Sequence, residues 1–206
     1  MRLLKEVSAL QFTKDQINES IEKNNGVLKL RGVIQRADTK NANGRIYPYE
    51  ILKREIDNYK KLVKERRSHG ELDHCDQPVV NLKNVSHIIS DIEMDEDGVV
   101  YGEIEILNTP MGEIVANLVK QQITVGISSR ALGSVVSKGD VDYVQDDLHI
   151  LCWDMVSEPS TPGAYMFKES KQYGPETLKR VIPRDVRIDR VANEILSFNE
   201  KIKNGR

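Results

Sequence analysis

Three short strings in the sequence contain the residue types that nucleophilic catalysis uses. His74 closes Gly-Glu-Leu-Asp-His, Ser128 lies in Gly-Ile-Ser-Ser-Arg, and Asp154 lies in Trp-Asp-Met-Val-Ser-Glu-Pro-Ser. A serine hydroxyl is a weak nucleophile until a base takes its proton, and the base works best when an acid holds its ring. The chain order of such groups differs between unrelated folds. The strings therefore indicate a candidate base, nucleophile and acid. Whether they form a catalytic site depends on their geometry in the fold.

His74 has acidic neighbours, since Glu71, Asp73 and Asp76 lie within three residues of it. A carboxylate next to an imidazole orients it and favours its charged form. The alternative is a loop histidine that makes a local hydrogen bond. The two interpretations remain open from the sequence.

Ser128 and Asp154 each have a structural alternative as well. Ser128 and Ser129 precede Arg130, where the nucleophile elbow of a hydrolase has glycine, and paired serines after a strand are commonly turn residues. Asp154 lies in an apolar strand pattern, where burial is costly unless the carboxylate is paired. It is an orienting acid, an outward-facing residue or half of a salt bridge.

Metal and thiol chemistry are weaker hypotheses. The metal-binding residue types lack the tight paired spacing of a zinc site; they are His69, His74, Cys75, His87, His149 and Cys152. Isolated cysteines usually pack as small apolar side chains. The sequence contains no phosphate loop and no dinucleotide fingerprint. We expect neither a metal nor a cofactor.

Composition limits the partners. The 206 residues carry a formal net charge of −2, which gives no reason to expect nucleic acid. Two cysteines are too few for a disulfide framework and favour a reducing compartment. No run has the length or character of a signal peptide or a membrane span. We expect a soluble protein without a membrane partner.

Hydrophobic periodicity predicts a mixed α+β fold. Helices are predicted over 13–24 with Thr13 as N-cap, from Pro48 to residue 62, and over 111–122. Residues 68–77 are predicted as a loop that carries His74. Strand patterns occur at 27–37, 79–94, 99–107, 123–127, 135–136, 141–144 and 148–156.

The strings together resemble the prohead proteases of T-even-type bacteriophages, which are relatives in fold of the herpesvirus assemblin proteases. The resemblance covers most of residues 27–166. Its motifs are Asn43–Pro48, Gly70–His74, Tyr101–Glu103, Gly126–Ser134, and Asp154 followed by Glu158–Ser160. It implies an α+β fold with a herpesvirus-protease-like mixed β-barrel core and inserted and C-terminal helices.

The resemblance also implies roles for the site residues. His74 is then the general base and Ser128 the nucleophile. The third member lies on a strand twenty to thirty residues after the serine, a window that holds His149 and Asp154. We favour Asp154. The alternatives that stay open are His149, Glu71 and Asp73.

Oxyanion stabilisation and substrate binding have their own candidates. The backbone amides of Ser129 and Arg130 and the loop 160–163, which ends at Gly163, are close enough in sequence to the site to serve. Herpesvirus relatives use an arginine on that later loop, which this loop lacks. The Arg130 guanidinium is the candidate substitute.

By the same resemblance the chain is a serine endopeptidase of prohead maturation. Its substrates are then scaffold or core proteins and the major capsid protein, inside a prohead assembled in the host cytoplasm. The implied cut follows a glutamate that has Leu or Ile two residues before it. Leu4-Lys5-Glu6 and Ile17-Asn18-Glu19 match this pattern and permit self-cleavage.

The predicted organisation is an N-terminal helical segment (1–26), a protease domain (27–170) and a charged C-terminal helical tail (171–206). The tail either tethers the enzyme to the scaffold core or packs on its own domain. A homo-oligomer is compatible with this plan. A catalytically inactive internal head or scaffolding protein of the same fold is the alternative function, and a zinc-dependent hydrolase is a third hypothesis.

Overall fold

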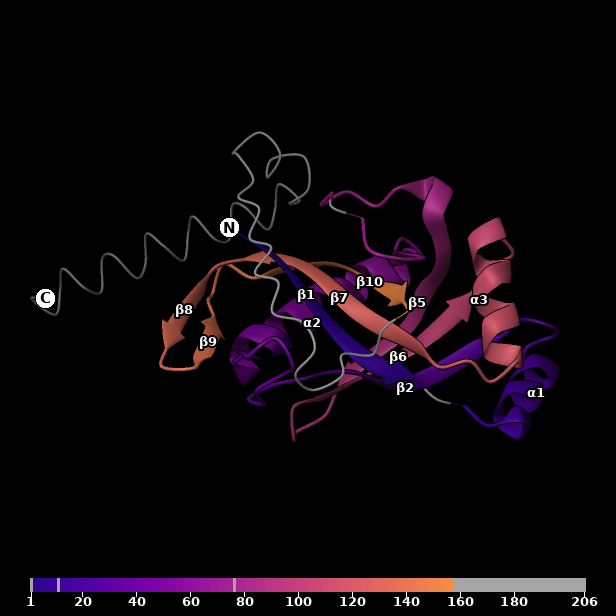
Figure 1. Cartoon of the computed structure of the whole chain (residues 1–206), viewed down its shortest axis with the longest axis horizontal. Coiled ribbons are helices and arrows are strands. Elements are labelled where there is room, and N and C mark those ends of the chain that lie inside the picture. Colours follow the sequence, from indigo (N-terminus) through magenta and orange to yellow (C-terminus); the bar gives the residue numbers. More distant parts are fainter. Residues whose placement is uncertain (1, 11, 76, 158–206) are drawn as a thin grey trace, which may run out of the picture.

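The computed structural model describes residues 2–10, 12–75 and 77–157. Their strands form three sheets (Figure 1). The first sheet carries the candidate serine and has the order β1-β7-β10, with both pairings antiparallel. Its strands are β1 (Arg2–Leu10), β7 (Val125–Gly133) and β10 (His149–Val156).

The second sheet is antiparallel, with the order β2-β6-β5-β4. Its strands are β2 (Lys29–Arg36), β6 (Val99–Ile106), β5 (Val85–Met94) and β4 (His69–Glu71). The third sheet has the order β3-β9-β8 and lies at the left end of Figure 1. Its strands are β3 (Arg45–Ile46), β9 (Val141–Val144) and β8 (Val135–Lys138).

The described strands do not close into a barrel, and in this respect the expected β-barrel core is wrong. Each sheet has two edge strands. β4 approaches β10 closely, but the link between them is one isolated bridge between Leu72 and Met155. Closure requires a continuous hydrogen-bonded ladder around the sheet, and β4 is too short to provide one. The α+β class itself is confirmed.

Three α-helices occur in the described part of the chain, where the periodicity predicts them. α1 (Lys14–Lys23) begins at a capping box between Thr13 and Gln16. α2 (Tyr49–Lys64) follows Pro48, and α3 (Pro110–Lys120) has Thr109 as N-cap. α2 packs against β5 and β10, while α3 packs against β5 and β6. α1 and α3 lie together at the right of Figure 1.

The hydrophobic core lies between the helices and the sheets. Leu52, Ile56 and Tyr59 form the buried face of α2. The ring of Tyr59 meets the indole of Trp153 edge to face, with 4.7 Å between centroids, a favourable aromatic geometry. Because Trp153 precedes Asp154 in β10, this packing fixes the strand that carries the candidate acid.

Several boundaries differ from the predictions. β5 begins at Val85, not at residue 79, because Asn81 caps the short 3₁₀ helix η1 (Leu82–Asn84) first. β7 continues to Gly133, so Ser128 lies within the strand and not after it. The segment predicted as helical over 1–26 also contributes β1 to the sheet of β7. The predicted tail, 171–206, lies outside the described residues.

Candidate active site

Strand alternation brings the acid and the serine together. Ser128 of β7 pairs with Asp154 of β10, and Arg130 pairs with Cys152. Residues directly opposite each other share a face, and so do residues two apart along a strand. All four side chains therefore point to one side of the sheet, while Ser129 points to the other. Each of these residues is buried.

His74 reaches this face through the loop that follows β4. The Asp73 N–H donates to the carbonyl of Met155 at 2.7 Å, and Asp73 has a φ of +63°. Aspartate tolerates this left-handed conformation better than most residues. The Leu72–Met155 bridge and this bond hold the start of the loop against β10. The His74 side chain therefore lies over Ser128 and Asp154.

The three side chains form a continuous hydrogen-bonded line. His74 Nδ1 lies 2.9 Å from Asp154 Oδ2, and His74 Nε2 lies 2.6 Å from Ser128 Oγ. An ionised carboxylate only accepts hydrogen bonds, so Nδ1 carries the proton and donates it. The lone pair of Nε2 then faces the serine hydroxyl. This arrangement can transfer a proton from Ser128 to His74.

Asp154 remains ionised although it is fully buried. Burial raises the pKa of Asp154, but the hydrogen bond from His74, the charge of Arg130 and the Glu71 N–H together lower it below its ordinary value. The Glu71 N–H donates to Oδ1 at 3.0 Å. The predicted acid is thus a buried anion with several donors around it, which meets the condition that buried charges be paired.

Arg130 lies beneath Asp154 and does not face the serine hydroxyl. Its Nε is 2.9 Å from Asp154 Oδ2, and its Nη2 is 3.1 Å from Asp154 Oδ1 and from Glu71 Oε1. Nη1 donates to the carbonyl of Gln77 at 2.6 Å. Every nitrogen of the guanidinium is engaged. This placement does not fit the expected oxyanion role of the Arg130 side chain, and leaves only its backbone amide as a candidate.

The other candidates lie in different surroundings. His149 Nδ1 is 3.4 Å from Glu55 Oε2, so His149 pairs with α2 and not with His74. Glu71 contacts Arg130 and not the imidazole. The Oγ of Ser129 is buried without a partner among the described residues. Gly163 lies outside the described residues.

His87 and Gly70 lie next to the site, and the sequence analysis gave neither of them a catalytic or positioning role. His87 is buried in β5; its Nε2 lies 3.1 Å from the Trp153 carbonyl and its Nδ1 2.9 Å from Ser86 Oγ. Burial lowers the pKa of His87 to about 4. A Cβ on Gly70 would lie 2.1 Å from the Trp153 carbonyl oxygen and 2.2 Å from His87 Nε2. Only glycine permits this approach of β4 to β10.

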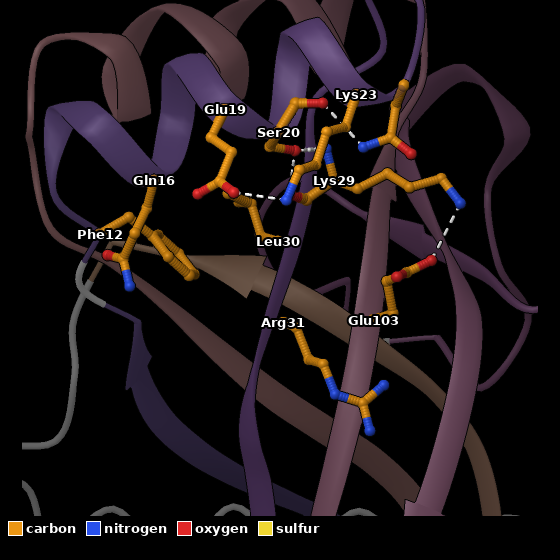
Figure 2. A pocket seen from close by; sticks show the side chains of 10 residues that line it. Phe12, Gln16, Glu19, Ser20, Lys23, Lys29, Leu30, Arg31 and Glu103 are labelled. Atoms are coloured by element: carbon orange, nitrogen blue, oxygen red, sulfur yellow. Dashed lines mark hydrogen bonds and ion pairs between the residues drawn. The ribbon is translucent and has the colours of Figure 1, made fainter.

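A cavity of about 500 Å³ lies elsewhere, between α1 and the sheet of β2 and β6 (Figure 2). It shares no residue with the His74 line. Its charged side chains are already paired: Lys29 with Glu103 at 2.9 Å, and Lys23 with Glu19. Nothing in its lining suggests the chemistry of a reaction.

Two features are absent from the described part of the chain. No group of three or more His, Cys, Asp and Glu side chains is arranged to hold a metal ion there. Across the same residues, no helix combines the length and apolar character that crossing a lipid bilayer requires.

Comparison with known proteins defines the class of protein as a protease. Residues 12–172 match the family described as prohead core protein serine proteases. The chain belongs to this family. It is 28% identical over 145 residues to the prohead core protein protease of Enterobacteria phage T4, a match that covers 68% of each chain.

The fold agrees with this family. The solved structure of the bacteriophage T4 capsid assembly protease gp21 superposes with a TM-score of 0.64 and 22% identity, covering 77% of this chain and 98% of the other. The superposition shows that the two chains share a fold. Together with the family match and the similarity to the T4 prohead core protein protease, it confirms the recognition drawn from the sequence motifs, a T4-type prohead protease.

Proposed function

We propose that this prohead protease is a serine endopeptidase in which Ser128 is the nucleophile, His74 the general base and Asp154 the orienting acid. The observation that carries the proposal is the line from Asp154 Oδ2 to His74 at 2.9 Å and from His74 to Ser128 Oγ at 2.6 Å. His74 takes the serine proton as Oγ attacks the scissile carbonyl, then gives it to the leaving amine. Asp154 stabilises the imidazolium in between.

The substrates we propose are scaffold or core proteins and the major capsid protein, cleaved inside the prohead during maturation. The names of the T4 relatives, a prohead core protein protease and a capsid assembly protease, support this substrate class and location. The backbone amides of Ser129 and Arg130 and the loop ending at Gly163 remain the proposed oxyanion donors. A fold relation to the herpesvirus assemblin proteases and a homo-oligomeric state also remain predictions.

Self-cleavage after Glu6 is a part of the proposal that the position of β1 supports. In the β1–β7 ladder Glu6 is opposite Ser129 and Val7 is opposite Ser128. Opposed residues in an antiparallel ladder have Cα atoms roughly 4.5–5.5 Å apart. The peptide bond between residues 6 and 7 therefore runs beside the proposed nucleophile. Proteins commonly bind extended peptides as an added strand in this way.

Ser128 has no exposed surface in the full chain. A second protein can reach it only after a covering segment moves, and β1 is one of the two strands paired directly beside it. Loss of residues 1–6 would remove part of that pairing. Self-cleavage would then precede cleavage of other proteins.

Mass spectrometry of the purified full chain after incubation tests the proposal. We expect the wild type to lose residues 1–6 and Ser128→Ala to remain intact. Ser129→Ala is the matched control, because Ser129 is on the opposite face of β7, and it should cleave like the wild type. A Ser128→Ala protein that cleaves itself at the wild-type rate would remove the proposed mechanism. An intact wild type that also resists a serine-directed phosphonate would favour the inactive scaffolding alternative.

A further inference from the structure

A buried cluster of charges lies directly beneath the proposed triad. Arg130, Asp154 and Glu71 are each fully buried. The guanidinium holds both carboxylates: it contacts the two oxygens of Asp154 at 2.9 and 3.1 Å and Glu71 Oε1 at 3.1 Å. The backbone N–H of Glu71 also donates to Asp154 Oδ1. The cluster therefore joins β4, β7 and β10 at the acid.

The contacts fix the orientation of the Asp154 carboxylate. Oδ1 accepts from the Glu71 N–H and from Arg130 Nη2, while Oδ2 faces His74 Nδ1 and forms an ion pair with Arg130 Nε. The Nε–H itself donates to Cys152 Sγ at 3.2 Å. A planar guanidinium that donates to one oxygen and lies 2.9 Å from the other opposes rotation of the carboxylate about its χ2 angle. A lysine ammonium supplies the same charge from a single point and cannot hold both oxygens in that plane. The arrangement thus requires arginine for its geometry as well as its charge.

The net charge of the cluster and His74 together is zero only when His74 is protonated. With a neutral imidazole the cluster holds two carboxylates and one guanidinium, a net charge of −1. When His74 takes the serine proton, the net charge becomes zero. In a buried site this difference favours the imidazolium of the transition state. The other titratable groups that face the acid are Cys152 of β10, His87 of β5 and Tyr59 of α2, and none of them is charged at neutral pH.

We propose that Arg130 is a positioning residue that aims Asp154 at His74, and that Glu71 supplies the second negative charge which completes the cluster. This inference rests on the proposed serine mechanism and adds to it two residues outside the triad. Glu71 suits this role because Oε1 accepts from the Asn81 N–H at 2.7 Å and from Arg130, while Oε2 has no hydrogen-bond partner among the described residues.

Arg130→Lys and Arg130→Met separate geometry from charge. Arg130→Lys keeps the charge, so we expect Ser128-dependent cleavage to fall about 10²-fold with little change in its pH profile, because a misaimed acid costs that much. Arg130→Met leaves two carboxylates unpaired and should also move the acid limb of the profile to higher pH, since the extra negative charge favours the imidazolium.

Glu71→Gln should move the acid limb in the opposite direction. The amide oxygen can replace Oε1 in both of its hydrogen bonds, and the amide nitrogen takes the place of the unpartnered oxygen. One negative charge is lost without a lost contact, so the imidazolium is less favoured. We expect the limb to shift to lower pH. This variant keeps the proposal falsifiable if Arg130→Met does not fold.

The readouts are the rate of Ser128-dependent self-cleavage and the rate of phosphonate labelling between pH 4 and 9, both on the full chain. The His74 Nδ1 proton, observed by NMR in Ser128→Ala, reports the aim of Asp154 without any activity. We expect that resonance to be lost or exchange-broadened in Ser128→Ala with Arg130→Lys. Arg31→Met is the control, because Arg31 forms exposed pairs with Asp91 and Glu93.

Two results would overturn the inference while leaving the serine mechanism intact. One is an Arg130→Lys protein that cleaves within threefold of the wild type and keeps the Nδ1 resonance. The other is a shift of the acid limb in the same direction, or no shift, for Arg130→Met and Glu71→Gln. If Ser128→Ala retains activity, the proposed mechanism itself fails and this inference fails with it.

Discussion

Replacing Gly70 by alanine should damage the site although position 70 contacts no substrate. The added Cβ would lie 2.1 Å from the Trp153 carbonyl oxygen and 2.2 Å from His87 Nε2. An ordinary carbon contact is about 3.5–4.0 Å, so β4 and β10 must separate locally by at least about 1 Å. The Trp153 oxygen belongs to the backbone of β10, which is paired with β7, and cannot rotate away.

The cost has two components. Overpacking a well-filled interior destabilises a protein by about 1–3 kcal/mol. In addition, Glu71 follows Gly70 and its N–H donates to Asp154 Oδ1 at 3.0 Å, so a displaced β4 moves the acid relative to His74. A misplacement of about 1 Å in a catalytic group costs on the order of 10²-fold in rate. We therefore expect Gly70→Ala to lose about 10²-fold of its self-cleavage rate while it still folds.

Gly139→Ala is the matched control for stability. Gly139 lies in the β8–β9 hairpin with a φ of +60°, and a Cβ there meets nothing within 4 Å. The left-handed conformation costs alanine roughly 1–2 kcal/mol, a loss similar to that of Gly70→Ala. Urea unfolding and mass spectrometry on both variants separate the two effects. If Gly70→Ala cleaves itself as fast as Gly139→Ala, the close approach of β4 to β10 does not position the acid.

Two other predictions concern Asp154 and His87. Asp154→Asn replaces a carboxylate that only accepts hydrogen bonds by an amide whose N–H must face a donor, either His74 or Arg130. We expect an activity loss of about 10⁴-fold, measured as the phosphonate labelling rate. A loss below tenfold would contradict the orienting role. His87 is held neutral in the fold with its pKa lowered to about 4, whereas the unfolded chain binds a proton at His87 below about pH 6.5. The contribution of neutral His87 to stability is therefore complete above about pH 6.5 and is lost as the pH falls toward 4, by about 3 kcal/mol in all. His87→Gln should flatten this part of the plot of unfolding free energy against pH, measured by urea unfolding. Parallel plots for the two proteins would refute the assignment.

The secondary structure around the site could be predicted from the sequence because the segments are strongly patterned. Apolar alternation located β10, and apolar residues at helical spacing located α2 and α3. β4 could not be found in this way, since three residues carry too little pattern. β1 was missed as well, and the loop around His74 was predicted without the short strand that sets its path. The barrel was expected from a family resemblance and not from any residue pattern.

The partner of Asp154 shows what a single sequence leaves undetermined. A buried carboxylate in an apolar strand has to be paired, and this requirement was evident from the residues around Asp154. The identity of the partner depends on register, since Arg130 reaches Asp154 only because Ser128 lies opposite the acid. No local pattern specifies a pairing between positions 26 residues apart. The guanidinium was therefore expected at the oxyanion and is found beneath the acid.

Register also distinguishes the two adjacent serines. Side chains alternate along a strand, so Ser128 and Ser129 face opposite sides of the sheet and only one of them can share a face with Asp154. The pairing of β7 with β10 places Ser128 on that face, and the neighbouring Arg130 is held there by its bonds to Asp154. A slip of one residue would bring Ser129 to His74 but would turn the guanidinium away from both carboxylates. The buried ion cluster thus penalises the wrong register, which ties the choice of nucleophile to the same contacts that orient the acid.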